Sequence, residues 1–385
     1  MTLDHVGIAA LPEARALFEA LLGSAPYRTE TVERESVTTV FFGDGGRASA
    51  APKLELLETD AADSPVGKFL AGRGPGVHHL AFEVPSLDKA MARVRTLGLR
   101  LLGEPREGAD GKRIVFLHPK DTAGVLVELL ETPRAPRETI RVPTAGAEVA
   151  VHVSGPAEAP PLVVLHGALG STALETDRLV RFWERRFRVA AVDLRGHGES
   201  SASGGALTWE AMTDDVVAVA DALGLDRFRM FGFSMGGGVA LGVASRLDGR
   251  VERLAVHGVN VRWTAAEVEA MVGPMERAEA ENPFWARRLA ETHGAERWRG
   301  LVGQVADFTR GLPSRQTEMA ELNAITAQTL VSAGDADRFF DVAHAVGLYR
   351  EIPGARLWVL PGLDHPIQGV DAAAFARAVG DHLAS

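Results

Sequence analysis

The chain has 385 residues, of which 46% are hydrophobic and 24% are charged, and its formal net charge is -10. At roughly 150 residues per domain this length predicts two or three domains, and the composition is ordinary for a globular protein. The negative charge argues against nucleic acid and anionic membranes as partners, and no apolar run approaches the roughly 20 residues that span a bilayer.

Cysteine is absent, which excludes disulfides, thiolate metal sites and a cysteine nucleophile. Any chemistry must therefore come from His, Asp, Glu and Ser. The first residues contain no basic stretch followed by an apolar segment, so we expect no export signal and a cytoplasmic location.

The first third of the chain contains an internal repeat of one strand, one helix and three strands. In the first copy the pattern predicts these elements at residues 3–9, 12–22, 28–33, 37–42 and 53–57. The second copy has the same order, at 77–84, 87–97 with Ser86 as N-cap, 100–103, 113–117 and 125–130. Two prolines and several charges follow at 132–138, and we place a linker at 133–138 between domains 1–132 and 139–385.

Histidine and glutamate fall at matching places in the two copies. His5 and His79 lie on the opening strands, and Glu55 and Glu128 lie on the closing strands, 50 and 49 residues later. A pseudo-twofold arrangement would bring two imidazoles and two carboxylates together, a set suited to a divalent metal with open positions. The alternative is that they are ordinary strand residues facing solvent, which their register across the repeat disfavours.

These segments resemble methylmalonyl-CoA epimerase of the vicinal oxygen chelate superfamily, over nearly all of residues 1–132. The resemblance is carried by LDHVGIA at 3–9, KLELL at 53–57, GVHHLAFEV at 76–84, HPKD at 118–121 and GVLVEL at 124–129. It implies paired βαβββ modules, His79 and not His78 as the ligand, an acyl-CoA substrate and a divalent metal. Cobalt or manganese is the expected metal, with zinc or iron as alternatives. The implied chemistry is exchange of the α-proton between two carbonyl groups.

Two departures from that family concern single positions. Some members have Gln where this chain has Glu55, and a second carboxylate neutralises a divalent ion more fully. Some members also have a carboxylate on the strand written VTTV at 37–40, where threonine cannot act as acid or base at neutral pH. The proton carriers are therefore left unassigned. The alternatives for this half are a ring-cleaving dioxygenase and a non-catalytic binding domain; Glu55, as a fourth ligand, argues against the dioxygenase.

From residue 139 an antiparallel pair at 139–142 and 148–153 is followed by buried strands that alternate with helices, a pattern typical of an open, mostly parallel sheet. One such strand, at 227–233, runs into GFSMG at 232–236 and then into a helix of small residues. That context is the one a nucleophile elbow requires, so Ser234 is the candidate nucleophile.

A serine hydroxyl needs a base and a third group that orients the base. Asp337 follows the strand at 329–334, and His365 follows the strand at 358–360. The order Ser, Asp, His resembles the α/β-hydrolase superfamily, and the resemblance assigns Asp337 as the acid, with Asp335 in reserve. The competing interpretation of Asp337 is a helix cap. His382 is the alternative base.

The segment after the strand at 161–165 reads HGA at 166–168 and resembles the loop that supplies oxyanion-hole amides. We therefore assign the donors to the backbone of Ala168 and Met235, and interpret His166 and His197 as structural. Residues 263–327 interrupt the alternation with helical sequence and are expected to form a cap over the active site.

The sequence thus predicts a cytoplasmic, two-domain enzyme, a hydrolase fused to a racemase or epimerase. The first domain moves the α-proton of methylmalonyl-CoA or a similar compound, and the second cleaves an ester or thioester. The alternatives are a dioxygenase-like domain fused to a carbon-carbon bond hydrolase and a binding domain fused to an esterase. The expected partner is a small acyl substrate such as an acyl-CoA, and a homodimer is compatible with this interpretation.

Overall fold

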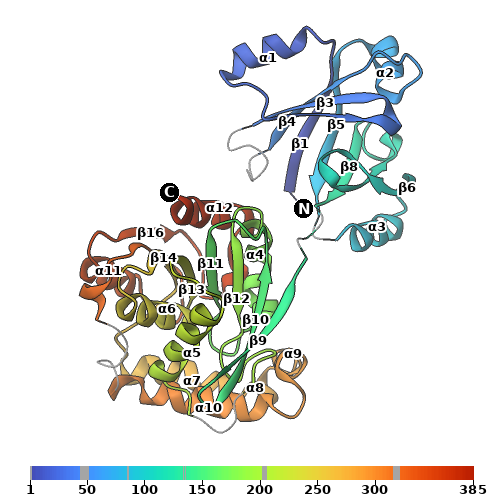
Figure 1. Ribbon diagram of the computed structural model, residues 1–385. Helices are drawn as coiled ribbons and strands as arrows, with labels where there is room; N and C mark the ends of the chain where they lie inside the picture. Colours follow the sequence, from blue (N-terminus) through green and yellow to red (C-terminus); the bar gives the residue numbers. More distant parts are fainter. Residues whose placement is uncertain are drawn as a thin grey trace. The chain divides into compact units, whose positions relative to one another are not determined.

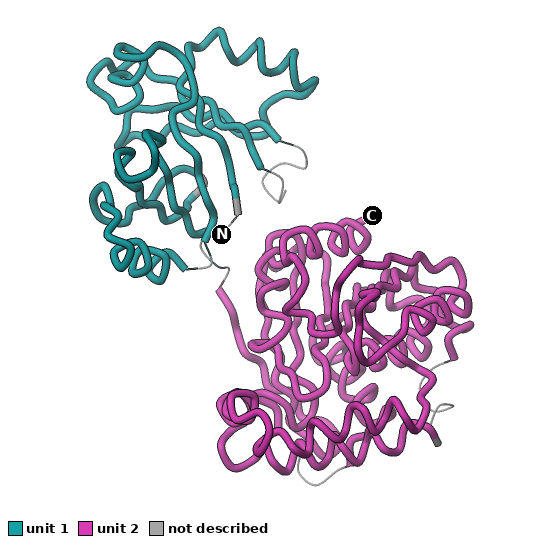
Figure 2. The backbone as a smooth tube through the Cα atoms, turned by 180° about the vertical axis from the view of Figure 1, so that it is seen from behind, with its two compact units in different colours: residues 1–134 teal, residues 135–385 magenta. Residues whose placement is uncertain are grey.

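The structure is a computed structural model that describes residues 2–43, 52–84, 86–132, 134, 136–201, 206–314 and 321–385. The chain divides into two compact units, residues 1–134 and 135–385 (Figure 2). The predicted two-domain architecture is confirmed. The predicted linker at 133–138 includes Pro133 and Ala135, which lie outside the described residues.

In the described part of the first unit, eight strands form a single sheet in the order β2-β3-β4-β1-β5-β8-β7-β6 (Figure 1). Within each half the opening and closing strands are parallel neighbours, and the halves meet where β1 and β5 run antiparallel. The paired βαβββ modules are therefore as predicted. The strands are β1 (Thr2–Ala9), β2 (Arg28–Val32), β3 (Val37–Phe42), β4 (Lys53–Glu58), β5 (Gly76–Glu83), β6 (Leu101–Glu107), β7 (Arg113–Leu117) and β8 (Leu126–Glu131).

The helices of the first unit are α1 (Ala14–Leu22), α2 (Pro65–Arg73) and α3 (Leu87–Thr96), with short 3₁₀ turns that include η1 (Glu33–Glu35). As predicted, the Ser86 side chain caps α3 by accepting the Lys89 N–H. Helix α2 was not predicted. Its start carries ordinary signals, because the Ser64 side chain accepts the Gly67 N–H and proline occupies the first helical position.

The second unit is built on another sheet, in the order β16-β15-β14-β13-β11-β12-β10-β9. Strands β11 to β16 pair in parallel, and β10 pairs antiparallel with both β12 and β9. The strands are β9 (Glu138–Thr144), β10 (Ala147–Ser154), β11 (Pro161–Leu165), β12 (Arg188–Val192), β13 (Phe228–Phe233), β14 (Val251–His257), β15 (Gln328–Gly334) and β16 (Arg356–Leu360). Strand order reverses at β11, which places a switch point at its carboxyl end.

Helices cover both faces of this sheet, because alternate strand residues point to opposite sides. Leu162 and Val164 pack on the side of α4 and α12, whereas Val163 and Leu165 pack on the side of α5 and α6. The helices are α4 (Asp177–Trp183), α5 (Trp209–Ala222), α6 (Met235–Arg246), α11 (Val342–Glu351) and α12 (Ala372–Ala384).

A helical insertion separates β14 from β15, within the region 263–327 predicted to be helical. It contains α7 (Ala265–Glu276), α8 (Ala278–Glu281), α9 (Pro283–His293) and α10 (Trp298–Gly311). The Thr264 side chain and Glu267 form a reciprocal capping box that starts α7. Figure 1 shows the insertion in orange tones beside α5.

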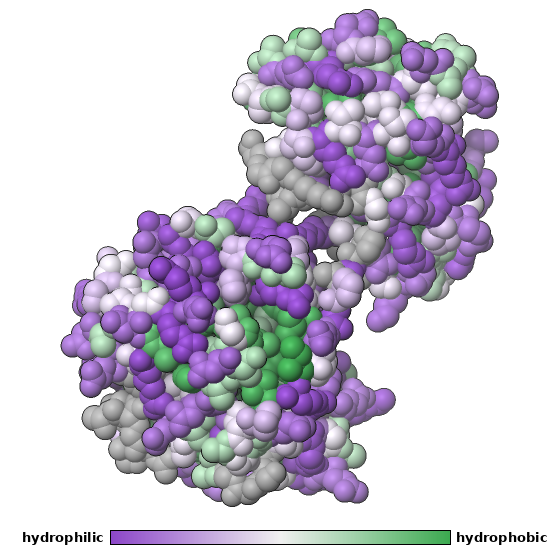
Figure 3. All heavy atoms as spheres, viewed as in Figure 1, coloured by the Kyte–Doolittle hydropathy of each residue, from purple (hydrophilic) through white to green (hydrophobic). Residues whose placement is uncertain are grey.

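In the described part of the chain, no helix is long and apolar enough to cross a membrane. Figure 3 shows hydrophilic residues over most of the visible face of each unit, in keeping with a charged fraction of 24%.

Candidate active sites of the two units

The first candidate site lies on the central strands of the first unit, where the register brings the two modules together. Gly7 is the neighbour of both Glu55 and His79, and Ala81 is the neighbour of both Glu128 and His5. The same pairing of a small residue with one histidine and one glutamate thus occurs on both β1 and β5, as a pseudo-twofold axis between the two modules requires. Gly7 must lack a side chain here, since a Cβ would lie 2.2 Å from the His79 ring.

All four residues predicted as metal ligands converge, and all are buried, with His79 only 3% exposed. His5 Nε2 lies 3.1 Å from His79 Nε2, 3.2 Å from Glu55 Oε2 and 3.8 Å from Glu128 Oε2. His79 Nε2 lies 3.0 Å from Glu128 Oε2 and 3.6 Å from Glu55 Oε2. The ligand atoms of His5, His79 and Glu128 all lie within 4.8 Å of one another.

This donor set fits a divalent ion. Ligand atoms about 2.1 Å from a metal lie about 3.0 to 3.4 Å apart at neighbouring positions of an octahedron or tetrahedron. The separations of 3.0 to 3.8 Å match that spacing closely. Imidazole and carboxylate donors suit manganese, cobalt, iron or zinc, so the residues present agree with the family's divalent metal.

Behind His5 lies a buried charged pair that the sequence interpretation did not single out. Asp4 Oδ2 accepts both His5 Nδ1–H, at 2.8 Å, and Lys112 Nζ, at 2.7 Å. A carboxylate on Nδ1 fixes the tautomer that leaves Nε2 free to bind a metal. Burial lowers the pKa of His5, but Glu55 and Asp4 outweigh it and raise that pKa to about 10, so a bound metal would take the place of a proton on Nε2. The sequence signal was the Asp-His pair at residues 4 and 5.

The ligand cluster opens into a cavity. Besides the ligands, its polar lining includes Glu35, Thr39, Arg106 and Lys112, and its apolar lining includes Phe116. The Arg106 guanidinium pairs with Glu35 and lies 5.3 Å from the centre of the Phe116 ring. The cavity thus combines an apolar wall with charged groups of both signs, in which Arg106 pairs with Glu35 and Lys112 with Asp4.

The second candidate site lies at the carboxyl ends of β11, β13, β15 and β16. Ser234 follows β13 in a strained backbone conformation, with φ +51°, and its side chain is 8% exposed. Two glycines make the turn possible, because a Cβ on Gly232 would lie 2.5 Å from Gly236 O, and one on Gly236 would lie 2.3 Å from His166 O. The geometry is that of a strand–turn–helix elbow.

Ser234, His365 and Asp337 form one hydrogen-bonded chain. The Ser234 hydroxyl lies 3.1 Å from His365 Nε2, and His365 Nδ1 donates to Asp337 Oδ2 at 2.7 Å. Asp337 Oδ1 also accepts the N–H groups of Phe339 and Phe340, so the carboxylate is fixed at both oxygens. The reserve residue Asp335 instead accepts the Gly362 N–H. His382, in α12, donates from Nε2 to the carbonyls of Leu254 in β14 and Gln328 in β15 and does not join the chain.

Residues 166–171, which we call the β11 loop, pass beside Ser234. A Cβ on Gly167 would lie 3.2 Å from Ser234 Cβ, and the Gly167 N–H donates to Glu175 Oε2 at 2.7 Å. Among the described residues the N–H groups of Ala168 and Met235, the two predicted oxyanion donors, make no hydrogen bond. They are free to bind a ligand beside Ser234.

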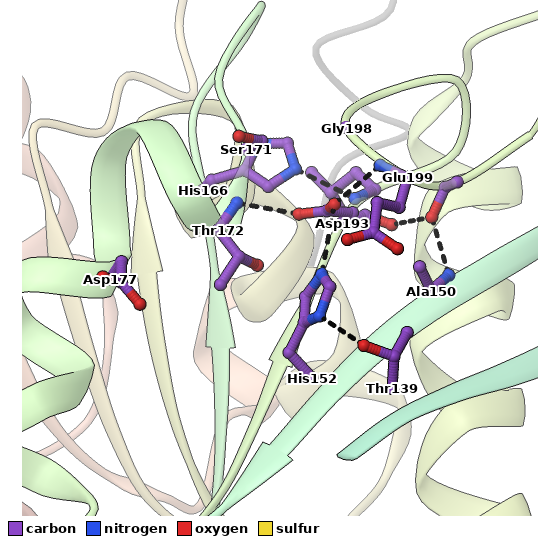
Figure 4. Close-up of polar contacts among 12 residues, drawn as sticks. Thr139, Ala150, His152, His166, Ser171, Thr172, Asp177, Asp193, Gly198 and Glu199 are labelled. Atoms are coloured by element: carbon purple, nitrogen blue, oxygen red, sulfur yellow. Dashed lines mark hydrogen bonds and ion pairs between the residues drawn. The ribbon is translucent and has the colours of Figure 1, made fainter. Parts of the chain in front are cut away.

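Residues 193–201, which we call the β12 loop, are held by a buried carboxylate. Figure 4 shows Asp193 between His152 and the backbone N–H groups of Thr172 and Glu199, which donate to it. These contacts outweigh the effect of burial and lower the pKa of Asp193. A Cβ on Gly198 would lie 2.0 Å from Asp193 Oδ2, so this position requires glycine.

The two further histidines of these loops are bonded to backbone. His166 Nε2 accepts the Leu194 N–H at 2.9 Å, and His197 Nε2 accepts the Leu169 N–H at 3.2 Å. Neither ring nitrogen is left to act as a second base, in keeping with the structural interpretation of both residues. Glu175 and the insertion residue His293, which also contact the β11 loop, were missed because nothing in their local sequence marks them.

Comparisons with known proteins divide the chain in the same way. Residues 4–116 match the Glyoxalase/Bleomycin resistance protein/Dioxygenase superfamily, and residues 160–298 match the alpha/beta hydrolase fold. The ethylmalonyl-CoA/methylmalonyl-CoA epimerase of Cereibacter sphaeroides is 38% identical over 133 residues, which cover 33% of this chain and 95% of the epimerase.

The second unit has relatives of full hydrolase length. The 2-hydroxymuconate semialdehyde hydrolase of Pseudomonas sp. is 30% identical over 283 residues, 66% of this chain and 95% of the hydrolase. The crystal structure of the enol-lactonase from Burkholderia xenovorans LB400 aligns with a TM-score of 0.54 and 24% identity, over 64% of this chain and 100% of the lactonase, and shows the shared fold. The chain therefore belongs to two families, through its first unit to the glyoxalase superfamily, where it is similar to methylmalonyl-CoA epimerases, and through its second to the alpha/beta hydrolases.

Proposed function

We propose that the second unit is a serine hydrolase that cleaves an ester or thioester. The observation that carries this proposal is the hydrogen-bonded chain from Ser234 through His365 to Asp337. Ser234 Oγ would attack the substrate carbonyl while its proton passes to His365 Nε2. Asp337 would hold the imidazole in the tautomer that accepts this proton and would stabilise the imidazolium.

The oxygen that becomes negative in that step needs donors beside Ser234. The N–H groups of Ala168, in the β11 loop, and of Met235, at the start of α6, have no acceptor among the described residues and would supply these donors. His365 would return its proton to the leaving oxygen or sulfur, and water would then release the acyl group by the reverse sequence.

We propose that the first unit exchanges the α-proton of methylmalonyl-CoA or a similar acyl-CoA. His5, Glu55, His79 and Glu128 would hold the divalent metal, with cobalt or manganese as the expected ions. When bound, such an ion supplies Lewis acidity that favours loss of the proton between two carbonyl groups. The supporting observation is the convergence of four buried residues with ligand atoms beside a cavity.

The cavity residues have distinct parts in this reaction. Asp4 would hold His5 Nε2 towards the metal, and Lys112, which pairs with Asp4, would offset the negative charge of that carboxylate. Arg106, which pairs with Glu35 beside the Phe116 ring, would interact with an anionic part of the substrate. Thr39 does not serve as a proton carrier, because its hydroxyl donates to Glu30 O at 3.1 Å.

The two activities can be tested on one preparation of the full chain. We expect deuterium to enter methylmalonyl-CoA in deuterated water when the metal is present, and not after treatment with a chelator. We expect release of p-nitrophenol from a p-nitrophenyl ester, unchanged by the chelator. Exchange that survives complete metal removal would contradict the first proposal, and absence of hydrolysis across a panel of esters and acyl-CoA thioesters would contradict the second.

A second candidate for the hydrolase unit is cleavage of a carbon-carbon bond. It is favoured by the 30% identity to 2-hydroxymuconate semialdehyde hydrolase. The same three side chains would serve, since the reaction also passes through attack on a carbonyl. Adding 2-hydroxymuconate semialdehyde to the ester panel separates the two: a higher kcat/KM for this substrate than for every ester favours carbon-carbon cleavage.

A further inference from the structure

Leu169, in the β11 loop, has an unusual backbone conformation. Its φ is +56°, in the left-handed region that leucine rarely adopts, and its side chain is 3% exposed. It follows Ala168 directly, so a contact that fixes the Leu169 N–H fixes the Ala168–Leu169 peptide, which adjoins the peptide that carries the Ala168 N–H. Such a conformation persists only where surrounding contacts hold it.

Two buried imidazoles hold Leu169 from opposite sides. His197 Nε2 accepts the Leu169 N–H at 3.2 Å, and His293 Nε2 donates to the Leu169 carbonyl at 3.0 Å. Each ring is fixed by a second bond, because His197 Nδ1 donates to Arg195 O at 2.9 Å and His293 Nδ1 accepts the Gly198 N–H at 2.9 Å. Both backbone groups of Leu169 are thus bonded to side chains from other segments.

The bonding pattern requires both rings to be neutral, since each ring uses one nitrogen as donor and one as acceptor. Burial lowers the pKa of His197 well below its ordinary value, and it lowers the pKa of His293 to about 4. Near neutral pH both rings therefore keep the donor and acceptor that Leu169 needs.

His293 belongs to a different part of the unit from the loop that it holds. It is the last residue of α9, in the helical insertion, whereas Leu169 follows β11. Arg297, at the start of α10, donates to the carbonyls of Gly198 and Ser200 at 2.9 Å each. The insertion is thereby anchored to the β12 loop by Arg297, and it reaches the β11 loop through His293.

We propose that His293 and His197 are positioning residues that aim the Ala168 N–H at the oxyanion, so that the helical insertion completes the oxyanion site. This inference rests on the hydrolase proposed above. Neither His293 nor His197 would contact the substrate, because both act through the backbone of Leu169. The insertion therefore contributes to the chemical step as well as to any substrate contacts.

A matched pair of substitutions at His293 isolates the contact with Leu169. In His293→Gln the amide nitrogen can occupy the place of Nε2, which restores the donor to Leu169 and loses the acceptor for Gly198. In His293→Asn the amide oxygen can occupy the place of Nδ1, which restores the acceptor for Gly198 and loses the donor to Leu169. Arg287→Ala, on the exposed side of the same helix, is the control.

We expect kcat for p-nitrophenyl ester hydrolysis to fall about 10- to 100-fold in His293→Asn with KM nearly unchanged, because a misdirected donor affects the transition state alone. His293→Gln should remain within a few-fold of the parent, and Arg287→Ala should match it. The Ki of a trifluoromethyl ketone, which forms a tetrahedral adduct with Ser234, should rise in His293→Asn by the factor that kcat/KM falls. Product inhibition should be unchanged.

Several results would overturn the proposal. Two of them are an unchanged kcat in His293→Asn and a change in KM alone. The third is a greater loss of kcat in His293→Gln than in His293→Asn, because that result would show that His293 acts by anchoring the insertion through Gly198. Tryptophan fluorescence establishes that each variant is folded, and the same Gln and Asn pair at His197 provides an independent test if a variant at 293 does not fold. An inactive parent enzyme would instead contradict the proposed hydrolase.

Discussion

Asp337 Oδ2 lies 2.7 Å from His365 Nδ1, whereas Asp335, two residues earlier, bonds to the backbone of Gly362. We therefore expect a change to asparagine to affect hydrolysis differently at these two positions. Asp337→Asn should lower kcat for ester hydrolysis by about 10⁴, because the amide favours the wrong imidazole tautomer. Asp335→Asn should retain activity near that of the parent. Activity lost in the second variant but not in the first would move the acid to Asp335.

Ser234 should carry hydrolysis alone. Replacing Ser234 with Ala removes the nucleophile, and loss of one member of such a triad typically costs on the order of 10⁶ in turnover. Release of p-nitrophenol should become undetectable, while metal content and proton exchange on methylmalonyl-CoA stay at the parent's level, because every proposed metal ligand lies in residues 1–134. Hydrolysis as fast as that of the parent would refute the assignment.

His79 should be essential for metal binding, and its neighbour should not be. In His79→Ala the site loses one of its two imidazole nitrogens, so the bound metal should fall well below one equivalent in elemental analysis. His78→Ala is the matched comparison, because His78 contacts His79 Nδ1 at 3.1 Å and is not a proposed ligand. It should retain stoichiometric metal. The reverse result would shift the ligand by one residue.

Asp4 should act on metal affinity without touching the ion. Asp4→Asn removes the charge that fixes His5 Nδ1–H and leaves Lys112 without its carboxylate partner at 2.7 Å. Loss of such an orienting carboxylate typically weakens metal binding by about 10- to 100-fold. Titration of the apo-protein with cobalt, followed by visible absorption, measures this, with Asp60→Asn on the surface as control. Equal cobalt affinity in Asp4→Asn and Asp60→Asn would show that Asp4 does not support metal binding.

Local patterns in the sequence were sufficient to predict the fold of both units. Helices and strands depend mainly on residues close together in the sequence. The 3.6- and 2-residue periodicities, the repeat and the strand-to-helix context of Ser234 therefore predict elements that agree with the structure within a few residues. Helix α2 was missed because its nine residues carry little hydrophobic periodicity and its only signals are the Ser64 cap and Pro65.

The residues that support the sites were not predictable in this way. Lys112 approaches Asp4 from 108 positions away, and His293 reaches Leu169 from 124 positions away. Contacts of this kind depend on tertiary packing, and a single sequence carries no local trace of them. The proposed reacting residues lie in recognisable motifs, whereas the residues that orient them do not.

Glu175 offers a test of electrostatics beside the proposed nucleophile. Its carboxylate is enclosed by the β11 loop, since a Cβ on Gly170 would lie 2.2 Å from its Oε2. Burial raises the pKa of Glu175 to about 7, and the hydrogen bond from the Gly167 N–H opposes that shift only in part. The folded protein therefore keeps a proton here that the unfolded chain, with an ordinary pKa near 4.5, releases.

This difference fixes the sign of a pH effect on stability. Below pH 4.5 the carboxyl of Glu175 is protonated in both states. Between pH 4.5 and 7 only the folded state holds the proton, so the contribution of Glu175 to the free energy of unfolding falls as the pH rises. Glu175→Gln should abolish this part of the slope, and above pH 7 it should unfold at a higher urea concentration than the parent. Tryptophan fluorescence measures the unfolding of the second unit alone, because all 6 tryptophans lie in that unit. Glu158→Gln, on an exposed turn, should keep the parent's slope, and an unchanged slope in Glu175→Gln would show that Glu175 ionises normally.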